Sequence, residues 1–454
     1  MSDLTHALVD RALAVEWTPP TRHAVLRCVV DWAGCGLGGL EHPLPSHVGA
    51  AHWIFGQSSD CTLLGQGSRA SVLEACLFNG TASHVLDLDD VVVAFHGHPG
   101  VVIIPAVFAL GEARHADGEL AARSIAVGYE AAALFGRLVH ARIGERGWHP
   151  TAVLGCLAAA VASSVMLGLS ADETATAVGL AATQAGGVRA MFGSHGKGIH
   201  AGRAASVGAL SAALVSEGVR VPTAGLEGPV GLLQAAFGLG ADQQEAMALL
   251  GSDANAEPAI LNTAFKRHAA CGATHSLIDA VGETVAENGI DPLDISQISA
   301  RVHRSAMMAA GIPEAATPLQ AKFSLAHLAA LAAFTHPIGP EVLTDDSWTS
   351  DDVFALRKNV RLTVDESLEY KEATAAEATL TLKNGATFAK FVDLPKGRRS
   401  NPISDEGLNQ KFMSMGSAIL GDDRCQAALQ AMWQLADFDD CRQAIMLLAQ
   451  PENR

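Results

Sequence analysis

Carboxylates and imidazoles are concentrated in one short segment of the 454-residue chain. His84, Asp87, Asp89 and Asp90 are followed by His98, which stands directly before a proline. A residue before proline is disfavoured in helices, so we expect His98 on a loop. If the acidic stretch is helical, Asp87 and Asp90 share a face and Asp89 points elsewhere. An imidazole near a carboxylate suits a general base; a capping cluster and a metal site are the alternatives, the latter without a recognised ligand spacing.

A second histidine, His149, precedes Pro150 at the expected start of an apolar helix. Proline is favoured in the first helical turn, which places His149 at a helix N-terminus. The helix dipole there favours the neutral imidazole, the form that a proton acceptor requires. The simpler alternative is a histidine that only caps the helix.

Lysine is rare in the first half of the chain, because Lys197 is the only lysine before Lys266. Lys197 lies in the glycine-rich segment 193–200, where small residues let a ligand approach closely. A compact ammonium group there could bind a carboxylate or donate a proton. A Schiff base to a pyridoxal cofactor is conceivable, but no phosphate-binding segment is evident, and an exposed loop lysine is the remaining alternative.

The segment from Lys266 to His275 offers further candidates. Cys271 and His275 could pair as a thiol nucleophile and its base, although a buried structural cysteine is the favoured interpretation. Lys266 and Arg267 fall where two domains are expected to meet, which is a common place for a pocket. His327 lies in an apolar stretch and is expected in the core unless it faces that cleft.

The chain is long enough to predict at least two domains. Alanine-rich segments up to residue 265 are apolar around most of their circumference, which predicts a multilayer all-α domain. Alternating segments and the turn Asn384-Gly385 predict a smaller α/β domain over 266–399. Residues 400–454 are predicted to return to the helical domain, which then comprises 1–265 and 400–454. The predicted fold class is mainly α with a smaller α/β domain.

The composition excludes several classes of protein. Hydrophobic residues make up 49% and charged residues 17%, which rules out disorder. A net charge of −17 argues against nucleic acid or an anionic membrane as a partner. The eight cysteines form no Cys-x-x-Cys pair, which favours free thiols in a reducing compartment. No secretory signal or membrane span is evident, so we expect a soluble cytoplasmic protein.

The order of these motifs resembles that of the MmgE/PrpD family over nearly the whole chain. The motifs that carry the resemblance are Asp87-Leu-Asp-Asp90, Gly97-His98-Pro99, Gly147-Trp-His149-Pro150, the Lys197–His200 segment, Gly225-Leu-Glu-Gly228-Pro229 and Lys266…Cys271-x-x-Thr274-His275. Members of that family include dehydratases, decarboxylases and epimerases of small polycarboxylates. The resemblance implies a two-domain fold, a homodimer, and catalysis with no metal and no organic cofactor.

The resemblance also implies site residues. Matching positions are Asp87, His98, His149, Lys197 and Lys266, whereas Cys271 stands where some members have histidine and His327 where some have tyrosine. Val91 replaces a threonine of decarboxylase and dehydratase members, and Ala269 replaces a common proline. The spacing from Asp87 to His98 looks more like the epimerase branch.

These observations predict a cofactor-independent lyase or isomerase that acts on a small polycarboxylate. His98 or His149 would remove a proton next to a carboxylate, Lys197 and Lys266 would hold carboxylates, and Asp87 would orient an imidazole. Further substrate contacts are expected from His200, Arg203, Arg267, His275 and His327. Dehydration of a 2-methylcitrate-like acid is placed first, epimerisation of an iminodisuccinate-like acid second and cis-aconitate-type decarboxylation third. A non-catalytic, carboxylate-binding helical dimer is the alternative of a different class.

Overall fold

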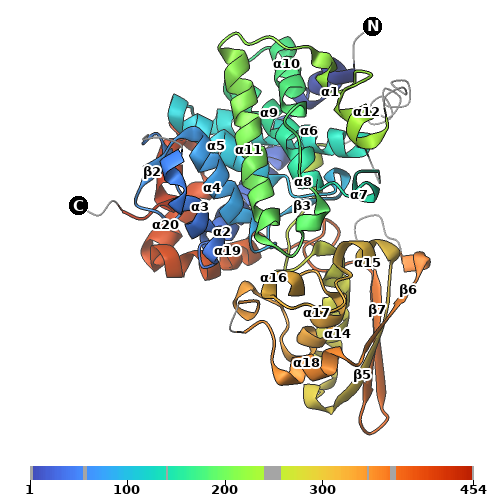
Figure 1. Cartoon of the computed structure of the whole chain (residues 1–454). Helices are drawn as coiled ribbons and strands as arrows, with labels where there is room; N and C mark the ends of the chain where they lie inside the picture. The colour runs from blue at the N-terminus through green and yellow to red at the C-terminus, as the bar shows by residue number, and fades with distance from the viewer. Residues whose placement is uncertain are drawn as a thin grey trace.

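The computed structural model of the chain describes residues 4–54, 59–139, 142–239, 257–344, 347–368 and 375–451. A large helical body carries both ends of the chain, and a smaller part contains a sheet flanked by helices (Figure 1). This confirms the predicted mainly α class with a smaller α/β part. Among the described residues, no helix combines the length and apolarity needed to cross a membrane.

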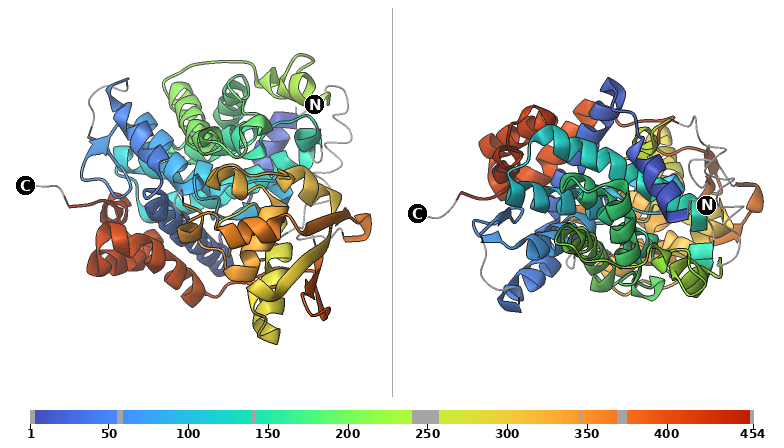
Figure 2. Two further views of the ribbon diagram at one scale, coloured as in Figure 1. Left: turned by 60° about the horizontal axis from the view of Figure 1, so that its bottom comes forward. Right: turned by 90° about the horizontal axis from the view of Figure 1, so that it is seen from above.

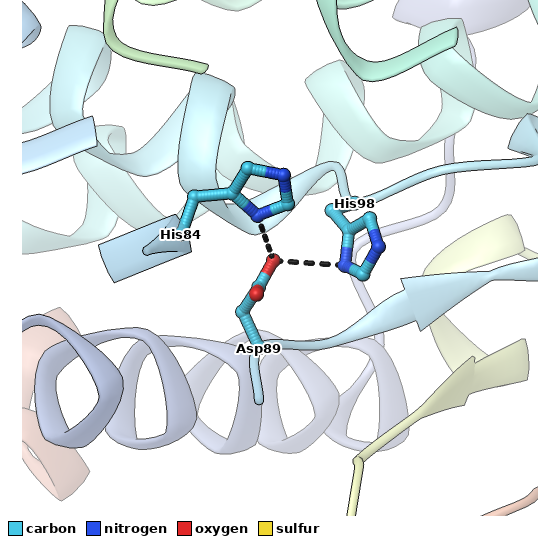
Figure 3. Close-up of side chains that lie close together, drawn as sticks. All are labelled: His84, Asp89 and His98. Carbon is cyan, nitrogen blue, oxygen red and sulfur yellow. Dashed lines mark hydrogen bonds and ion pairs between the residues drawn. The ribbon is translucent and has the colours of Figure 1, made fainter. Parts of the chain in front are cut away.

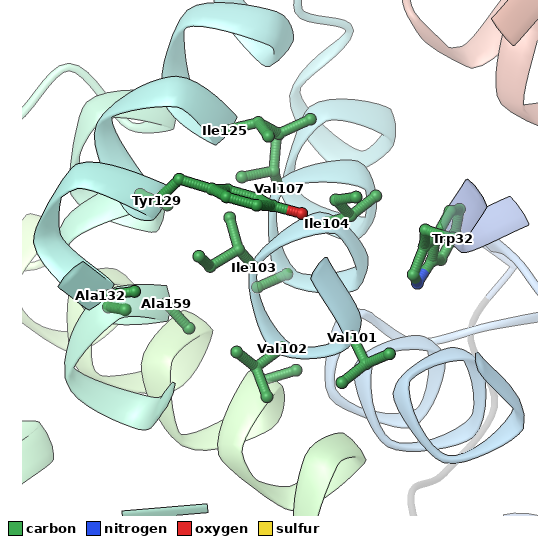
Figure 4. Packing of buried hydrophobic residues seen from close by; sticks show 14 of the residues in the cluster. Trp32, Val101, Val102, Ile103, Ile104, Val107, Ile125, Tyr129, Ala132 and Ala159 are labelled. Atoms are coloured by element: carbon green, nitrogen blue, oxygen red, sulfur yellow. The ribbon is translucent and has the colours of Figure 1, made fainter. Parts of the chain in front are cut away.

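The large body consists of helices that pack in several layers. They are α1 (Leu4–Leu13), α2 (Pro19–Gly39), α3 (Pro43–Ala50), α4 (Val72–His84), α5 (Gly100–Arg114), α6 (Gly118–Val139), α7 (Arg142–Glu145), α8 (Pro150–Val153), α9 (Gly155–Met166), α10 (Ala171–Ala182), α11 (His195–Ser216) and α12 (Leu232–Phe237). The strand pair β1 (Cys61–Thr62) and β2 (Arg69–Ala70) adds a short ladder. Helix α5 is apolar on nearly every side because it lies between other helices: Figure 4 shows it between Trp32 and Tyr129.

Helices α4 and α11 pack very closely, and both carry residues of the site described below. A Cβ atom added at Gly202 of α11 would lie 2.1 Å from the carbonyl oxygen of Leu77 in α4. Glycine at this position lets the two backbones approach more closely than any larger residue would allow.

The smaller part is built on a four-stranded sheet with the order β6-β5-β7-β8. Its strands are β5 (Ile295–Val302), β6 (Val360–Val364), β7 (Ala376–Leu382) and β8 (Thr387–Val392); β5 pairs parallel with β6 and antiparallel with β7, which pairs antiparallel with β8. The helices are α14 (His275–Asn288), α15 (Arg304–Ala310), α16 (Pro318–Ala321), α17 (Leu325–Phe334) and α18 (Asp351–Arg357). The predicted hairpin at Asn384-Gly385 is confirmed, with Gly385 at φ 88°.

The C-terminal segment returns to the large body. Helices α19 (Asp405–Leu420), α20 (Asp422–Trp433) and α21 (Arg442–Ile445) follow the sheet, and α19 and α20 pack against α2 from the other end of the chain (Figure 2). Ser404 caps α19 as expected, since its hydroxyl accepts a hydrogen bond from the Gly407 amide.

A short strand pair holds the segment after α4 beside the start of the smaller part. Strand β3 (Val91–Val92) pairs antiparallel with β4 (Thr263–Ala264), two residues before Lys266. The expectation that Asp87 and Asp90 share a helix face is wrong, because α4 ends at His84 and Asp87 lies in a turn with φ 55°. A non-glycine residue at positive φ is uncommon and marks a constrained turn.

Candidate active site

One oxygen atom of Asp89 lies between two imidazoles (Figure 3). Its Oδ2 atom is 3.0 Å from Nδ1 of His84 and 2.8 Å from Nδ1 of His98. All three groups are removed from water, with side-chain exposures of 1% for Asp89, 0% for His84 and 12% for His98. Helix α4 supplies His84, and the loop before α5 supplies His98, as its position ahead of Pro99 predicts. A carboxylate oxygen only accepts, so Nδ1 of His84, which is hydrogen-bonded to it, carries a proton and Nε2 of His84 has a lone pair. Nδ1 of His98 faces the same oxygen as an ion-pair contact without hydrogen-bond geometry.

Lys197 fixes the other side of His84. The ammonium Nζ of Lys197 is 2.9 Å from Nε2 of His84 and therefore donates to its lone pair. Lys197 stands in the first turn of α11 rather than in a loop, and Ser194 caps that helix. The glycine-rich segment thus begins a helix, and the lysine is buried, with 6% of its surface exposed.

Asp87 is the anionic partner of two lysines. Its Oδ1 atom is 3.2 Å from Nζ of Lys197 and forms a short ion pair with Nζ of Lys266. The same oxygen is 3.6 Å from Nε2 of His98, so the imidazole contact made by Asp89 is closer than the one expected of Asp87. Burial would raise the pKa of Asp87, but Lys197 and Lys266 outweigh it and hold that pKa well below its usual range.

His149 and His200 form the next layer of imidazoles. Their Nδ1 atoms are 3.1 Å apart, and the His149 ring stacks on that of His84 with centroids 6.0 Å apart. His149 is the residue before α8, as predicted. Its pKa lies well below the usual value, chiefly because of burial and secondly because of the Lys197 charge. Desolvation therefore does more than the expected helix dipole to keep this ring neutral.

The imidazoles around Asp89 are neutral at pH 7. Burial lowers the pKa of His84 to about 4, against the opposing effect of the Asp89 charge. Burial also lowers the pKa of His98, again opposed by Asp89. A neutral ring with Nδ1 protonated leaves Nε2 of His98 able to accept a proton.

Lys322 is a member of the cluster that the sequence analysis did not identify. It follows α16, is 2% exposed, and donates to the carbonyls of Leu86 and Val85 at 2.7 and 3.4 Å. Burial lowers its pKa to about 7, with contributions from Lys197 and Lys266 and an opposing effect of Asp87. The one available sequence signal was a lysine in an otherwise apolar stretch of a lysine-poor chain.

A narrow cavity, with room for about one water molecule in this structure, adjoins the cluster. Its polar lining residues are His84, Asp87, Ser194, Lys197 and Lys322, and Phe323 is an aromatic one. Lys197 lies over the rings of Phe323 and Phe192 at 5.6 and 5.8 Å. His98 and Lys266 contact Asp87, and His149 stacks on His84, but these three residues do not line the cavity. The cavity thus combines ammonium groups with aromatic surface, which suits a small anion with a carbon skeleton.

Other sequence candidates lie outside this cluster. Arg203 donates to the carbonyl of Gln184 at 2.7 Å near the surface. Arg267 lies 3.5 Å from Asp279, and His275 is 3.3 Å from the carbonyl of Ala270. His327 is buried beside Trp348, with Nε2 2.9 Å from that residue's carbonyl. The structure thus does not bring these four residues into the Asp87 cluster.

Cys271 lies near the cluster but is a poor nucleophile at neutral pH. Burial, followed by the charge of Asp87, raises the pKa of its thiol. The thiolate is the reactive form of cysteine, so this environment opposes nucleophilic catalysis. Its backbone amide donates to the carbonyl of Lys322 at 3.1 Å, which gives Cys271 a place in the framework of the site.

Two histidine–aspartate groups have separations that could hold a metal ion among the described residues: His84, Asp89 and His98, and His268, Asp279 and His336. In the first, Lys197 occupies the Nε2 lone pair of His84, so the Nδ1 atom that faces Asp89 carries a proton. In the second, Nδ1 of His268 accepts the Ile338 amide at 3.1 Å, so its Nε2 is protonated toward Asp279 at 2.9 Å. These hydrogen bonds compete with metal ligation at both groups.

Family models match most of the chain. The MmgE/PrpD N-terminal domain matches residues 7–245, and the MmgE/PrpD C-terminal domain matches residues 268–435. The chain belongs to the MmgE/PrpD family. The order of motifs in the sequence, which first suggested this family, is thereby confirmed.

Curated relatives of this MmgE/PrpD chain align over nearly its whole length. Human cis-aconitate decarboxylase is 26% identical over 452 residues, which cover 94% of the chain and 89% of the relative. A cis-aconitate decarboxylase-like protein of Aspergillus oryzae is 27% identical and covers 93% and 91%, respectively. The cis-aconitate decarboxylase of Aspergillus terreus is 23% identical over 93% and 90%.

Proposed function

We propose that this chain is a cofactor-independent lyase that forms a carbanion next to a carboxylate of a small polycarboxylate. The observation that carries the proposal is the buried set of three lysines around Asp87, beside imidazoles that share one oxygen of Asp89. Membership of a family whose curated relatives act as decarboxylases of a tricarboxylate supports it.

Substrate binding follows from the charges at the cavity. Lys197 and Lys322 line the cavity beside Asp87, so its positive charges favour a ligand that carries carboxylates. In this proposal a substrate carboxylate binds Lys197 and Lys322, the two lysines that line the cavity. The reacting carbon would then approach Nε2 of His98, which is 3.6 Å from Asp87 Oδ1.

Proton removal is assigned to His98. The Asp89 carboxylate lies 2.8 Å from Nδ1 of this ring, so its charge stabilises the imidazolium that forms when Nε2 takes the α-proton. The electron pair left on carbon spreads onto the adjacent carboxylate, where the lysines stabilise it. Lys197 is then placed to supply a proton, because it lines the cavity and contacts both His84 and Asp87.

Two outcomes of this carbanion chemistry are supported by different observations. In dehydration, the pair expels a neighbouring hydroxyl that leaves as water with a proton from Lys197. Asp87 Oδ2 is buried without a hydrogen-bond partner among the described residues, so it can accept from a substrate hydroxyl. In decarboxylation no α-proton is removed first: a carboxylate departs as CO₂, the bonding pair stays on carbon as the carbanion, and that carbon takes one proton. The relatives named cis-aconitate decarboxylase favour this outcome.

The reaction can be identified with a panel of substrates followed by NMR. The protein is incubated in D₂O with citrate, 2-methylcitrate, cis-aconitate and iminodisuccinate. New vinyl signals from a hydroxy acid indicate dehydration, CO₂ from cis-aconitate indicates decarboxylation, and exchange with no net loss indicates epimerisation. The same panel is run with Lys197→Met. Wild-type activity retained by this variant, or no reaction with any member, would contradict the proposal.

A further inference from the structure

Three lysines from distant parts of the chain cap four consecutive backbone carbonyls after α4. Lys322 donates to the carbonyls of residues 85 and 86, Lys266 to that of Asp87 at 3.0 Å, and Lys411 to that of Leu88 at 2.7 Å. Lys411 comes from α19, and its ammonium also pairs with Asp31 of α2 at 2.6 Å. The turn that carries Asp87 is thus held from three directions.

This arrangement gives hydrogen-bond donors to backbone carbonyls of the turn. These four carbonyls lie beyond the end of α4 and therefore have no helical partner, and a buried carbonyl without a donor is costly. The left-handed backbone at Asp87 adds strain that the surroundings must hold in place. Lys322 comes from the interior of the smaller part, between α16 and α17, whereas Lys266 stands at its start and Lys411 belongs to α19.

Lys322 also faces the cavity. It lines the cavity together with Asp87, Lys197 and Phe323, so its ammonium group lies between the turn and the proposed substrate. The charged groups that act on it are Asp87, Lys197, Lys266 and Asp89. A neutral amine would still be able to donate hydrogen bonds, but with less strength than the ammonium form.

We propose that Lys322 is a positioning residue through which the smaller part of the molecule sets the Asp87 turn, and that the charged form of Lys322 is the one that holds this turn for catalysis. The proposal rests on the proposed function where it concerns catalysis. The claim that Lys322 positions the turn rests only on its hydrogen bonds to the turn's carbonyls.

A pH dependence follows, with a defined sign. Burial brings the pKa of Lys322 to about 7, so raising the pH through 7 removes its charge. Activity should therefore fall on the alkaline side. A bound polycarboxylate stabilises the ammonium form, so the alkaline limb of kcat should lie at higher pH than that of kcat/KM.

The test compares Lys322→Gln with Lys322→Arg and with the control Lys358→Gln, an exposed lysine that follows α18. Glutamine keeps a donor but has no charge. At pH 6, kcat/KM of Lys322→Gln should be lower than wild type by about tenfold, and at pH 8.5 by less than about threefold. The guanidinium of Lys322→Arg stays charged, so the alkaline limb near pH 7 should disappear. If that limb persists unchanged in both variants, the proposal is wrong.

Hydrogen–deuterium exchange measured by mass spectrometry separates this inference from the proposed function. Peptides covering residues 85–98 should exchange at least about tenfold faster in Lys322→Gln than in wild type, while peptides from β7 and β8 stay unchanged. Unchanged exchange in 85–98 would overturn the positioning role even in an active enzyme. Faster exchange in a protein with no turnover would refute the proposed function and leave standing the claim that Lys322 positions the turn.

Discussion

Replacing Asp89 by asparagine tests the orientation of the proposed base most sharply. One oxygen of Asp89 is hydrogen-bonded to Nδ1 of His84 at 3.0 Å and lies 2.8 Å from Nδ1 of His98 as an ion-pair contact. Asparagine has nearly the same shape, but its amide carries no charge and presents an oxygen on one side only. If the amide nitrogen faces His98, the ring must adopt the tautomer that is protonated on Nε2, and Nε2 can then no longer accept a proton. If the amide oxygen faces His98, the imidazolium loses its negative partner.

The expected loss can be worked out from these contacts. A hydrogen bond to a charged group contributes about 1.5–3 kcal/mol. The Asp89–His98 contact strengthens when His98 becomes charged, so its loss raises the barrier by a similar amount. This corresponds to about a 10- to 160-fold decrease in kcat. KM should change little, because Asp89 does not line the cavity.

The assay measures kcat and KM for the substrate found in the NMR panel, with circular dichroism to verify folding. The matched control is Asp90→Asn. Burial holds the pKa of Asp90 well above its usual value, and its carboxyl contacts Tyr129 at 2.6 Å and the Gly100 amide at 3.1 Å. Since asparagine imitates a neutral carboxyl group, this variant should keep kcat within about threefold. Equal losses in the two variants, or no loss in Asp89→Asn, would refute the assigned orientation.

Three further predictions concern stability and a rejected nucleophile. Thermal melts should show a falling Tm from pH 7 to pH 5, because the imidazoles bind protons in the unfolded chain but stay neutral when buried in the folded one. His84, with its pKa of about 4, should lower the unfolding free energy by about 2 kcal/mol at pH 5. An unchanged Tm would contradict this. Gly202→Ala should lower the unfolding free energy by at least about 2 kcal/mol through its clash with the carbonyl of Leu77, measured by urea unfolding; wild-type stability would exclude the close packing. Cys271→Ala should keep kcat within about threefold, since the raised thiol pKa opposes thiolate formation; a large loss of kcat, or a substrate adduct on Cys271 of the wild-type protein, would contradict it.

Much of the site could be predicted because its residues stand out in the sequence. Lys197 and Lys266 are isolated lysines in a lysine-poor region, and His98 and His149 precede prolines that fix their place at helix starts. The role of Asp89 does not follow from the sequence, because helical spacing was expected for residues 87–90 whereas α4 ends at His84. A turn with positive φ at Asp87 changes which side each carboxylate faces, and no spacing rule gives that angle.

The remaining differences arise from contacts between distant segments. Lys322 and Lys411 reach the Asp87 turn from positions 236 and 323 residues away from their carbonyl partners, so local pattern could not place them there. The sequence allows His327 either in the core or in the cleft between the domains. Its contacts with Trp348 place it in the core. The element types were better determined, because the alternation in β5–β8 and the apolar helices are local signals. The homodimer and the cytoplasmic location stay predictions.

The central claim is that this site stabilises a carbanion beside a carboxylate, and binding of a carbanion mimic tests it most directly. The nitronate form of 3-nitropropionate imitates the carbanion of succinate, so isothermal titration calorimetry can compare it with succinate itself. We predict that wild-type protein binds the nitronate at least about 100-fold more tightly than succinate, and that Lys197→Met removes this preference. Equal affinities for the two ligands in the wild-type protein would contradict the account.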